Sequence, residues 1–408
     1  MRALWLCRAL PFPLDTGDRI YAARLLRSLA EAGCELTVAG FEGEARLPAG
    51  WPVRTITVPG RPHGTLRSLL SLRPLVGAAH ATAAFRGQVD GLAALNWDCV
   101  VFDHYAMDFA IPPFLRRRAR EGSGPVLVHV AHDHEASVYA SLVKGFRGSA
   151  FKRLGLWQNW LKTGWAERWI ARHVDLLTAI TPEDAARFAI DAPATPSVVL
   201  TPGYEGGVSN RRQIGAEVPR RVVMVGNYRW VAKAENLRLF VAAADAAFAA
   251  AGIELHVIGS MDEALAAELR AGSRATVLHG FVDDIAPHFA NARLAVVPEE
   301  IGGGFKLKFL DYIFGRMPVA SLTHATAGLP DEIRGAMICR ADLAGLVQAI
   351  VEQIDDTEAL THMQAEALAA AQARYRWQDR GRELLEAVQR LRRRPPAASS
   401  PALAGATR

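Results

Sequence analysis

The sequence has few cysteines and no long uncharged apolar run. Its four cysteines among 408 residues lie far apart and form no C-x-x-C pair. This argues against a zinc site or a disulfide framework and favours a reducing compartment. No apolar run reaches the roughly 18 residues that span a bilayer. The first fifteen residues contain Arg8 and two prolines but no small-residue cleavage site, so we expect a first strand there and a cytoplasmic protein.

The sequence also lacks helix-turn-helix, RNA-binding and zinc-finger signatures, so no nucleic-acid partner is expected despite a net charge of +5. Basic residues gather in segments 114–120, 144–173 and 390–394. Such patches suit an anionic lipid surface or a polyanionic acceptor. A solvated basic face explains them equally well, so peripheral contact with the inner face of a membrane is one of two open alternatives.

Apolar runs of strand length alternate with helical patterns through the first half of the chain. The strands are expected at residues 3–7, 36–40, 99–102, 126–130 and 176–180. A helix is expected over 19–32 with Gly33 as its C-cap, and another after Thr181 as N-cap. The alternation of strand and helix predicts a parallel sheet with helices on both faces.

The same alternation restarts at residue 221, after a stretch rich in glycine and polar residues. We therefore predict an α/β protein with two doubly wound, Rossmann-like domains that face each other across a cleft. The expected parts are a first domain (1–203), a linker (204–219), a second domain (220–375), a C-terminal helix that is a candidate to pack back on the first domain (376–392) and a disordered tail (393–408).

Three consecutive glycines, 302–304, follow a run that is expected to form a buried strand, 294–297. Apolar residues then recur at helical spacing over 305–314, so the glycines lie at a strand-to-helix turn. Glycine allows a ligand to approach the backbone closely, and the free N–H groups at the start of a helix favour an anion such as phosphate. In a protein of this fold class, that edge of the sheet faces the cleft.

The motifs of the second half resemble those of the retaining family-4 glycosyltransferases of the GT-B fold. They are a glycine after the first strand (Gly226), a lysine soon after it (Lys233), the segment "GFVDDI" (280–285), and the glycine run followed by Lys308 and Asp311. The similarity covers roughly residues 220–340, with a weaker likeness in the first half. Several motifs in the right order are far more specific than one glycine pattern.

The resemblance implies a nucleotide-sugar donor, which is a substrate, and no cofactor. The leaving diphosphate needs positive charge, and because the sequence shows no metal motif, lysines and backbone N–H groups are expected to supply it. Lys233 and Lys308 are the predicted catalytic cations. Gly226, Gly303 and Gly304 are predicted to contact the donor.

Three further residues are predicted to contact the donor. Asp311 matches the family glutamate that binds the ribose hydroxyls, but its side chain is shorter by one carbon–carbon bond, about 1.5 Å. Val282 lies in the segment that resembles the base-binding one. Arg229 stands two residues beyond the family's usual arginine position, which Asn227 occupies, so a surface arginine is an equal alternative.

The acidic residues near the glycines do not follow the family pattern. Many relatives have an acid where this chain has Gly303, and Glu299 and Glu300 are out of register with it. We expect these two side chains either near the ligand or as solvated charges at a strand end. Lys306, two residues before Lys308, is expected to be solvated.

In the first half, Gly17 precedes the first helix and would allow the loop to approach the donor phosphates or the acceptor. His104 and His134 are the candidates for a catalytic histidine near the transferred sugar, with His132 as the alternative to His134. His129 is expected inside a strand. The spacing of the last three histidines fits no standard metal site, so no metal is expected there.

Four tryptophans at 157, 160, 165 and 169 are interleaved with basic residues, which favours packing inside the domain over an interfacial membrane helix. The predicted function is transfer of a hexose with retention to an unknown saccharide or lipid-linked acceptor, in polysaccharide or glycolipid synthesis. The alternatives are a nucleotide-sugar epimerase or phosphorylase, and a non-catalytic nucleotide-sugar binder of the same fold.

Overall fold

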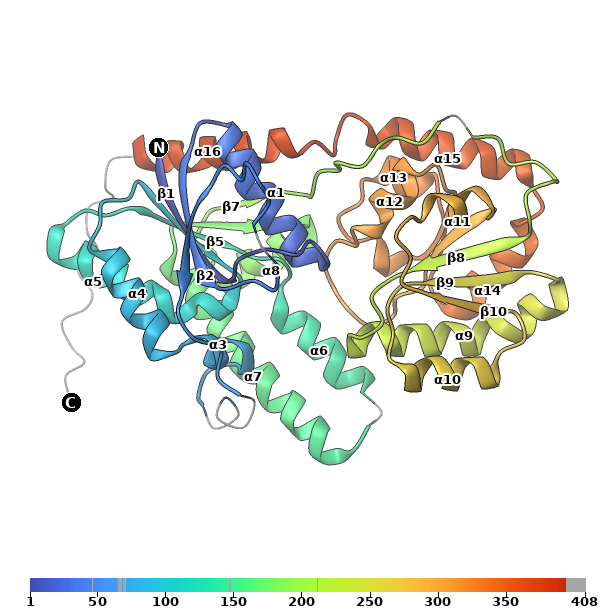
Figure 1. Cartoon of the computed structure of the whole chain (residues 1–408), viewed down its shortest axis with the longest axis horizontal. Coiled ribbons are helices and arrows are strands. Elements are labelled where there is room, and N and C mark those ends of the chain that lie inside the picture. Colours follow the sequence, from blue (N-terminus) through green and yellow to red (C-terminus); the bar gives the residue numbers. More distant parts are fainter. Residues whose placement is uncertain (46, 65–67, 69–70, 147, 211, 394–408) are drawn as a thin grey trace.

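The computed structural model describes residues 1–393 except 46, 65–67, 69–70, 147 and 211. It shows two α/β halves side by side, each with a central parallel sheet (Figure 1). The predicted fold class is confirmed, whereas the exact domain boundaries stay predictions. Residues 394–408 of the predicted disordered tail lie outside the described residues, and Arg393 ends the last helix.

The first sheet has seven strands in the order β3-β2-β1-β4-β5-β6-β7, all paired in parallel. They are β1 (Arg2–Ala9), β2 (Glu35–Phe41), β3 (Arg54–Val58), β4 (Cys99–Asp103), β5 (Val126–Val130), β6 (Leu176–Ala179) and β7 (Ser197–Val199). The central strands β4 and β5 are buried along their whole length because helices cover both faces. The sequence missed β3 and β7, since β3 is mostly only partly buried and β7 has three residues.

The helices of this half cover both faces of the sheet. They are α1 (Gly17–Glu31), α3 (Leu75–His80), α4 (Ala83–Ala93), the 3-10 helix η1 (Tyr105–Ala110), α5 (Ile111–Glu121), α6 (Glu135–Gly145), α7 (Ala150–His173) and α8 (Pro182–Asp191). Gly33 follows α1 with φ of 89°, as a C-cap glycine requires. The Thr181 hydroxyl accepts the Asp184 N–H at 3.0 Å, so the predicted cap of α8 is confirmed.

Helices α6 and α7 pack against each other and project from the first half (Figure 1). The expectation that the tryptophans of α7 pack inside the domain is wrong for two of them. Trp157 is 46% exposed and Trp165 is 59% exposed, while Trp160 and Trp169 are partly buried. No helix in the described part of the chain is long and apolar enough to cross a membrane.

The second sheet has six parallel strands in the order β10-β9-β8-β11-β12-β13. They are β8 (Arg221–Val225), β9 (Glu254–Ile258), β10 (Thr276–Gly280), β11 (Leu294–Val297), β12 (Val319–Leu322) and β13 (Ile338–Arg340). The helical elements are α9 (Val231–Ala251), α10 (Glu263–Gly272), α11 (Ala286–Ala290), α12 (Lys308–Phe314), η2 (Thr323–Thr326), α13 (Asp331–Gly335), α14 (Leu343–Gln353) and α15 (Thr357–Ala371). Of the strands, the sequence missed only the short β13.

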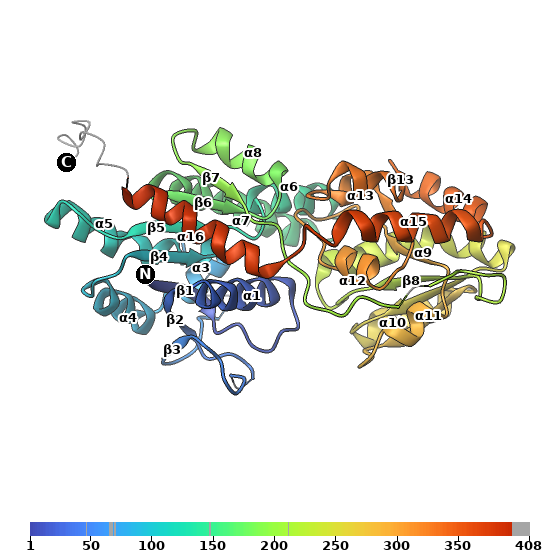
Figure 2. The same ribbon diagram turned by 90° about the horizontal axis from the view of Figure 1, so that it is seen from above.

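The last helix, α16 (Trp377–Arg393), returns to the first half and packs against α1 (Figures 1 and 2). The Ser28 hydroxyl of α1 accepts the Gly381 N–H at 2.9 Å. A Cβ atom at residue 381 would lie 2.4 Å from the Ser28 backbone, so glycine is needed for this close approach. The C-terminal helix predicted at 376–392 is thus present, one residue shifted, and it packs back on the first half.

Candidate active site

The second half meets the cleft at the carboxyl end of β8. Gly259, with φ of 132°, approaches Gly226 so closely that a Cβ atom would lie 1.7 Å from the Gly226 carbonyl oxygen. The Tyr228 N–H then donates to the Ser260 carbonyl at 2.7 Å, which fixes the turn before α9. Because α9 begins at Val231, Lys233 lies in its first turn.

Lys233 and Lys308 come together on one buried carboxylate. The Lys233 Nζ lies 2.5 Å and the Lys308 Nζ 2.8 Å from the same oxygen of Glu299. Glu299 is only 3% exposed, so the alternative of a solvated strand-end charge is wrong for it and holds only for Glu300. Two lysines predicted from separate motifs thus form one cluster with an acid that the sequence left unassigned.

Burial and the neighbouring charges shift the pKa values of the residues in this cluster. Burial, with the neighbouring Lys308 ammonium, lowers the pKa of Lys233 to about 7, against the pull of Glu299. For Glu299 the effect of burial is outweighed by the lysine charges, which hold its pKa well below the usual range. An anionic ligand would relieve the repulsion between the two lysines.

The glycine loop is held by side chains on both sides of it. Asn236 of α9 donates to the Ile301 carbonyl at 2.8 Å and accepts the Ile301 N–H at 2.9 Å. Gly302 and Gly304 have φ of 127° and 64°, values that favour glycine. Lys306 donates to the Gly303 carbonyl and, at 3.0 Å, to the Gly304 carbonyl. Lys306 is buried, so the expectation that it is solvated is wrong.

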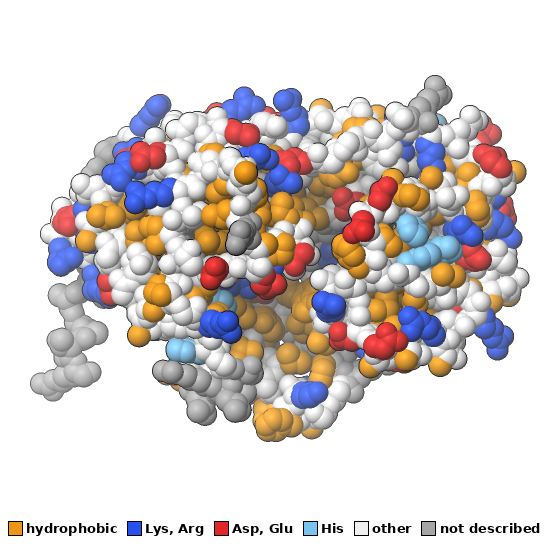
Figure 3. Space-filling model, in the orientation of Figure 1, with side chains coloured by type: hydrophobic (Ala, Val, Ile, Leu, Met, Phe, Trp, Pro, Cys, Tyr) orange, Lys and Arg blue, Asp and Glu red, His pale blue; other side chains and the backbone are white. Residues whose placement is uncertain are grey.

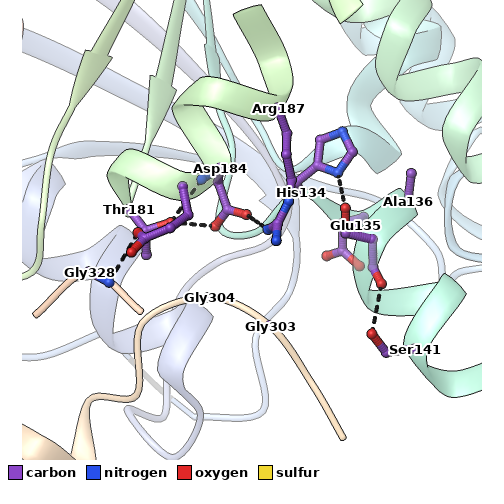
Figure 4. A network of polar contacts seen from close by, with 12 residues as sticks. His134, Glu135, Ala136, Ser141, Thr181, Asp184, Arg187, Gly303, Gly304 and Gly328 are labelled. Atoms are coloured by element: carbon purple, nitrogen blue, oxygen red, sulfur yellow. Dashed lines mark hydrogen bonds and ion pairs between the residues drawn. The ribbon is translucent and has the colours of Figure 1, made fainter. Parts of the chain in front are cut away.

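The loop lies against the first half of the molecule. A Cβ atom at Gly304 would lie 1.6 Å from an Asp133 carboxylate oxygen, and one at Gly303 would lie 3.0 Å from Val138. Figure 4 shows both glycines passing beside the start of α8, where Gly328 of the second half donates to Glu183 at 3.1 Å. The surface is hollowed between the two halves (Figure 3). The glycines therefore lie where the halves meet.

The other predicted donor contacts lie on the same half of the molecule. Arg229 is exposed and borders a cavity of about 210 Å³ together with Gly280 and Phe281, the residues just before Val282. Val282 itself is partly buried. Asp311, in α12, has its pKa raised to about 6 by burial, with Lys308 opposing the shift. Its carboxylate makes no hydrogen bond to another described residue, so it is available to a ligand.

The first half offers a cavity of about 350 Å³ at the carboxyl ends of β1 and β4. Arg8 and Asp18 form an ion pair on its wall, and Arg19 pairs there with Asp15 and Glu44. The other polar residues of the lining are Thr16, His80, Asp103, His104 and His132. Gly17 lies at the start of α1, beside this cavity, and a Cβ atom there would lie 3.5 Å from Leu307 of the second half. The loop predicted from Gly17 thus reaches both the cavity and the segment before Lys308.

His132 is held by Asp103 at the end of β4. Its Nε2 lies 2.5 Å from one Asp103 oxygen, and the other oxygen accepts the Trp5 indole N–H at 2.9 Å. Burial opposes protonation of His132, but the Asp103 charge and hydrogen bond outweigh it and raise the pKa. The Nδ1 atom is buried without a hydrogen-bond partner in the described part of the chain. A buried polar group left without a partner is uncommon in native structures.

His104 faces the same cavity in a strained conformation, with φ of 78°. Its Nδ1 accepts the Ala106 N–H at 3.1 Å, so its Nε2 carries the proton and lies 3.3 Å from Glu135. Burial and the Arg8 charge lower the pKa of His104, while burial raises the pKa of Glu135 to about 7. A neutral imidazole is therefore kept beside the cavity.

The other histidines of this region lie elsewhere. His134 binds the Ser137 hydroxyl at 2.6 Å and Asp191 of α8 at 3.2 Å, and it packs on Phe188. It does not line the cavity, so its contacts favour a structural role and leave His132 in the predicted place. His129 is buried in β5, as expected.

Arg8 and Asp103 were not singled out by the sequence. Both lie near the carboxyl ends of buried strands, β1 and β4, and Glu299 follows β11 in the same way. Because ligands of doubly wound sheets bind at that edge, polar residues at strand ends were the signal available.

Two parallel sheets in halves that meet at the glycine loop form the GT-B architecture. Residues 219–356 match the family described as glycosyl transferases group 1, and residues 16–203 match the glycosyl transferase 4-like domain. The two matches together cover both halves. The chain therefore belongs to the family-4 glycosyltransferases.

Solved structures agree on the fold. Sucrose-phosphate synthase from Thermosynechococcus elongatus superposes with a TM-score of 0.68 at 17% identity, covering 96% of this chain and 98% of that one. WaaG, a glycosyltransferase involved in lipopolysaccharide biosynthesis, gives 0.66 at 16% identity over 95% and 99%. Anabaena HepE in complex with UDP-glucose gives 0.60 at 14% identity over 96% and 100%. No curated protein sequence matches the chain significantly.

Proposed function

We propose that this glycosyltransferase moves a hexose from a nucleotide-sugar donor to an acceptor hydroxyl with retention of anomeric configuration. The observation that carries the proposal is the pair of lysines gathered on Glu299 beside the glycine loop, opposite the cavity of the first half. The complex of Anabaena HepE with UDP-glucose makes uridine diphosphate sugars the first donors to test.

In this reaction the donor diphosphate replaces the Glu299 carboxylate as the partner of the two lysines. Lys233, Lys308 and the N–H groups of Gly303 and Gly304 then stabilise the charge that develops as the diphosphate leaves. The leaving phosphate oxygen accepts the proton of the acceptor hydroxyl on the same face of the sugar, so no protein nucleophile is needed. Asp311 binds the ribose hydroxyls. Because protein groups supply the positive charge, we expect the same rate with and without EDTA.

The cavity beside His104 and His132 receives the transferred sugar or the acceptor. Its volume of about 350 Å³ falls in the range of small-ligand sites. The unpartnered His132 Nδ1 and the neutral His104 are suited to hydrogen bonds with sugar hydroxyls rather than to phosphate charge.

Product analysis tests the proposal against its alternatives. After a thermal-shift panel of nucleotide sugars identifies the donor, proton NMR of the reaction should show a new glycosidic bond with the donor's anomeric configuration. Isomerised donor without an acceptor would indicate an epimerase. Donor binding by calorimetry with no turnover on a panel of saccharide and lipid-linked acceptors would favour the non-catalytic binder.

The exposed face of α7 supports the proposal that the protein acts at the inner face of a membrane. Its acceptor there would be one used in polysaccharide or glycolipid synthesis. Five large apolar side chains on this helix are exposed: Phe151, Leu154, Trp157, Leu161 and Trp165. Lys152 and Arg153 are exposed beside them, and the hairpin of α6 and α7 projects from the body (Figure 1). Apolar side chains with neighbouring cations suit an anionic lipid surface.

Vesicle sedimentation tests this contact. The protein should bind vesicles with a third of anionic phosphatidylglycerol and leave pure phosphatidylcholine vesicles free. The double change Trp157→Ala and Trp165→Ala should abolish binding, whereas Leu95→Ala, which removes an exposed apolar side chain after α4, should not. Equal binding of both proteins to anionic vesicles would contradict the proposed contact.

A further inference from the structure

Three histidines from different elements meet on the second half. His256 lies on β9, His279 on β10 and His288 on α11, and one nitrogen of each ring lies within 4.8 Å of the others. In Figure 3 a group of histidine side chains is visible on the surface of this half, outside the hollow between the halves. No part of the proposed transfer uses them.

A carboxylate orients the first of these rings. His256 Nε2 lies 3.1 Å from Glu254 Oε2, and His256 Nδ1 lies 2.9 Å from His279 Nε2. With Nε2–H donating to Glu254, the lone pair of His256 Nδ1 points toward His279. A carboxylate behind a histidine is the usual second partner of a metal-binding imidazole. Arg221 donates to the same Glu254 oxygen at 2.7 Å, so its charge is balanced by that carboxylate.

The other two rings have room to adjust. His279 and His288 are partly exposed, and their ring centroids lie 4.5 Å apart at an interplanar angle of 69°. Because both rings are partly exposed, each can turn a ring nitrogen toward a shared cation.

We propose that His256, His279 and His288 bind a divalent transition-metal ion such as Zn²⁺ through one nitrogen each, with water as the fourth ligand. Imidazole prefers zinc, copper and nickel over magnesium or calcium. With zinc–nitrogen distances of 2.0–2.1 Å and tetrahedral angles, the ligand nitrogens lie about 3.4 Å apart. The 2.9 Å pair therefore opens slightly and the more distant nitrogen moves inward, by rotation of the exposed rings.

The ion would connect the two ends of one segment. His279 lies just before residues 280–287 and His288 just after them, and this segment contains Phe281 and Val282, the predicted base-binding stretch. Bound metal would therefore hold the segment against β9. Binding of the ion depends only on the three imidazoles, so its test is independent of the proposed transfer reaction.

Calorimetry with ZnCl₂ on the tag-free full-length chain tests the proposal. We expect one equivalent to bind, and His279→Ala and His288→Ala each to weaken the affinity at least tenfold. The matched control is His362→Ala, which removes an exposed histidine of α15 in the same half and should leave binding unchanged. With Co²⁺, the wild type should show the intense visible absorption of a four-coordinate site, and both variants at positions 279 and 288 should lose it.

Hydrogen exchange provides a second readout, since ZnCl₂ should slow exchange of the amides of residues 281–288 in the wild type only. Absence of zinc binding to the wild type would overturn the proposal. So would unchanged affinity in both His279→Ala and His288→Ala. Loss of binding in His104→Ala, with His279→Ala unaffected, would place the ion in the cavity of the first half and equally overturn it.

Discussion

The two sides of the cleft hold their charges differently. On the second half, two lysine ammonium groups share a single buried carboxylate, so this cluster carries excess positive charge. On the first half, each cation of the cavity has an acidic partner: Arg8 is paired with Asp18, Arg19 with Asp15 and Glu44, and His132 with Asp103. A surface with unbalanced cations is suited to a diphosphate, whereas a surface of balanced pairs is suited to neutral hydroxyl groups.

From this difference we infer that the two halves have different roles in sugar transfer. The charge that develops during sugar transfer would be stabilised by the second half, and the position of the sugar and the acceptor would be set by the first. Changes on the two sides should then have different kinetic signatures. The predictions below test this contrast, beginning with the largest expected effect.

Lys308→Ala should have the largest effect. Removing a cation that acts on the leaving group should lower kcat by about 10²–10³, the usual loss for a group that stabilises transition-state charge. Unfolding temperature should change little, because Glu299 keeps Lys233 as its partner. Steady-state transfer of radiolabelled sugar measures the rate, with Arg382→Ala on the exposed face of α16 as the control. Wild-type turnover in Lys308→Ala would contradict the proposed difference in role between the two sides of the cleft.

Glu299→Gln should lower the stability of the free protein and increase the stabilisation that a bound donor nucleotide provides. The change keeps the size of the side chain but leaves two partly buried lysines without a counterion, which costs about 3 kcal/mol. A bound nucleoside diphosphate restores the missing negative charge. Thermal unfolding should therefore show a larger stabilisation by UDP in the variant than in the wild type. Glu300→Gln, at the exposed neighbouring position, is the matched control.

If UDP stabilised Glu299→Gln no more than the wild type, the lysines would not face the diphosphate. That outcome would leave Glu299 as a purely structural counterion and would remove the main support for the donor site.

Asp311→Asn should weaken donor binding about tenfold, as expected when one carboxylate hydrogen bond is reduced to an amide one. A donor that lacks the ribose 2′-hydroxyl sharpens the test. The wild type should bind this donor less well than the normal one, whereas the variant should discriminate less between them. Calorimetry on both proteins with both donors measures the coupling. Discrimination that is equal in both proteins would show that Asp311 does not bind the ribose.

Sequence patterns predicted the fold well because apolar runs and glycines act locally. The sequence predicted the bounds of β5 as the structure has them, and the short local motif at Thr181 was enough to predict the helix cap there. The lysines at 233 and 308 came from the resemblance to a family, since nothing local distinguishes them from solvated lysines.

Contacts between distant segments were harder to predict. Whether Glu299 is solvated or buried depends on two lysines that lie 66 and 9 residues away along the chain. Lys306 looked solvated from its spacing because the loop carbonyls that it binds have no signature in sequence. His134 and His132 are two residues apart, and only the packing of α8 shows which of them is held away from the cavity.

The smallest expected effect concerns pH. Because burial and Lys308 lower the pKa of Lys233 to about 7, the cation that binds phosphate is progressively lost as pH rises above 7. Only the protonated form should bind the donor well, so the dissociation constant should rise about fivefold between pH 7 and pH 8, following the charged fraction. Lys233→Arg keeps its charge over this range and should show a flat profile, even if its absolute affinity is lower. Calorimetric titration of the donor at half-unit steps measures both profiles. A slope that persists unchanged in Lys233→Arg would assign the titration to a group of the first half, such as His132 or Glu135. The balanced side of the cleft would then be the one that senses the donor's charge.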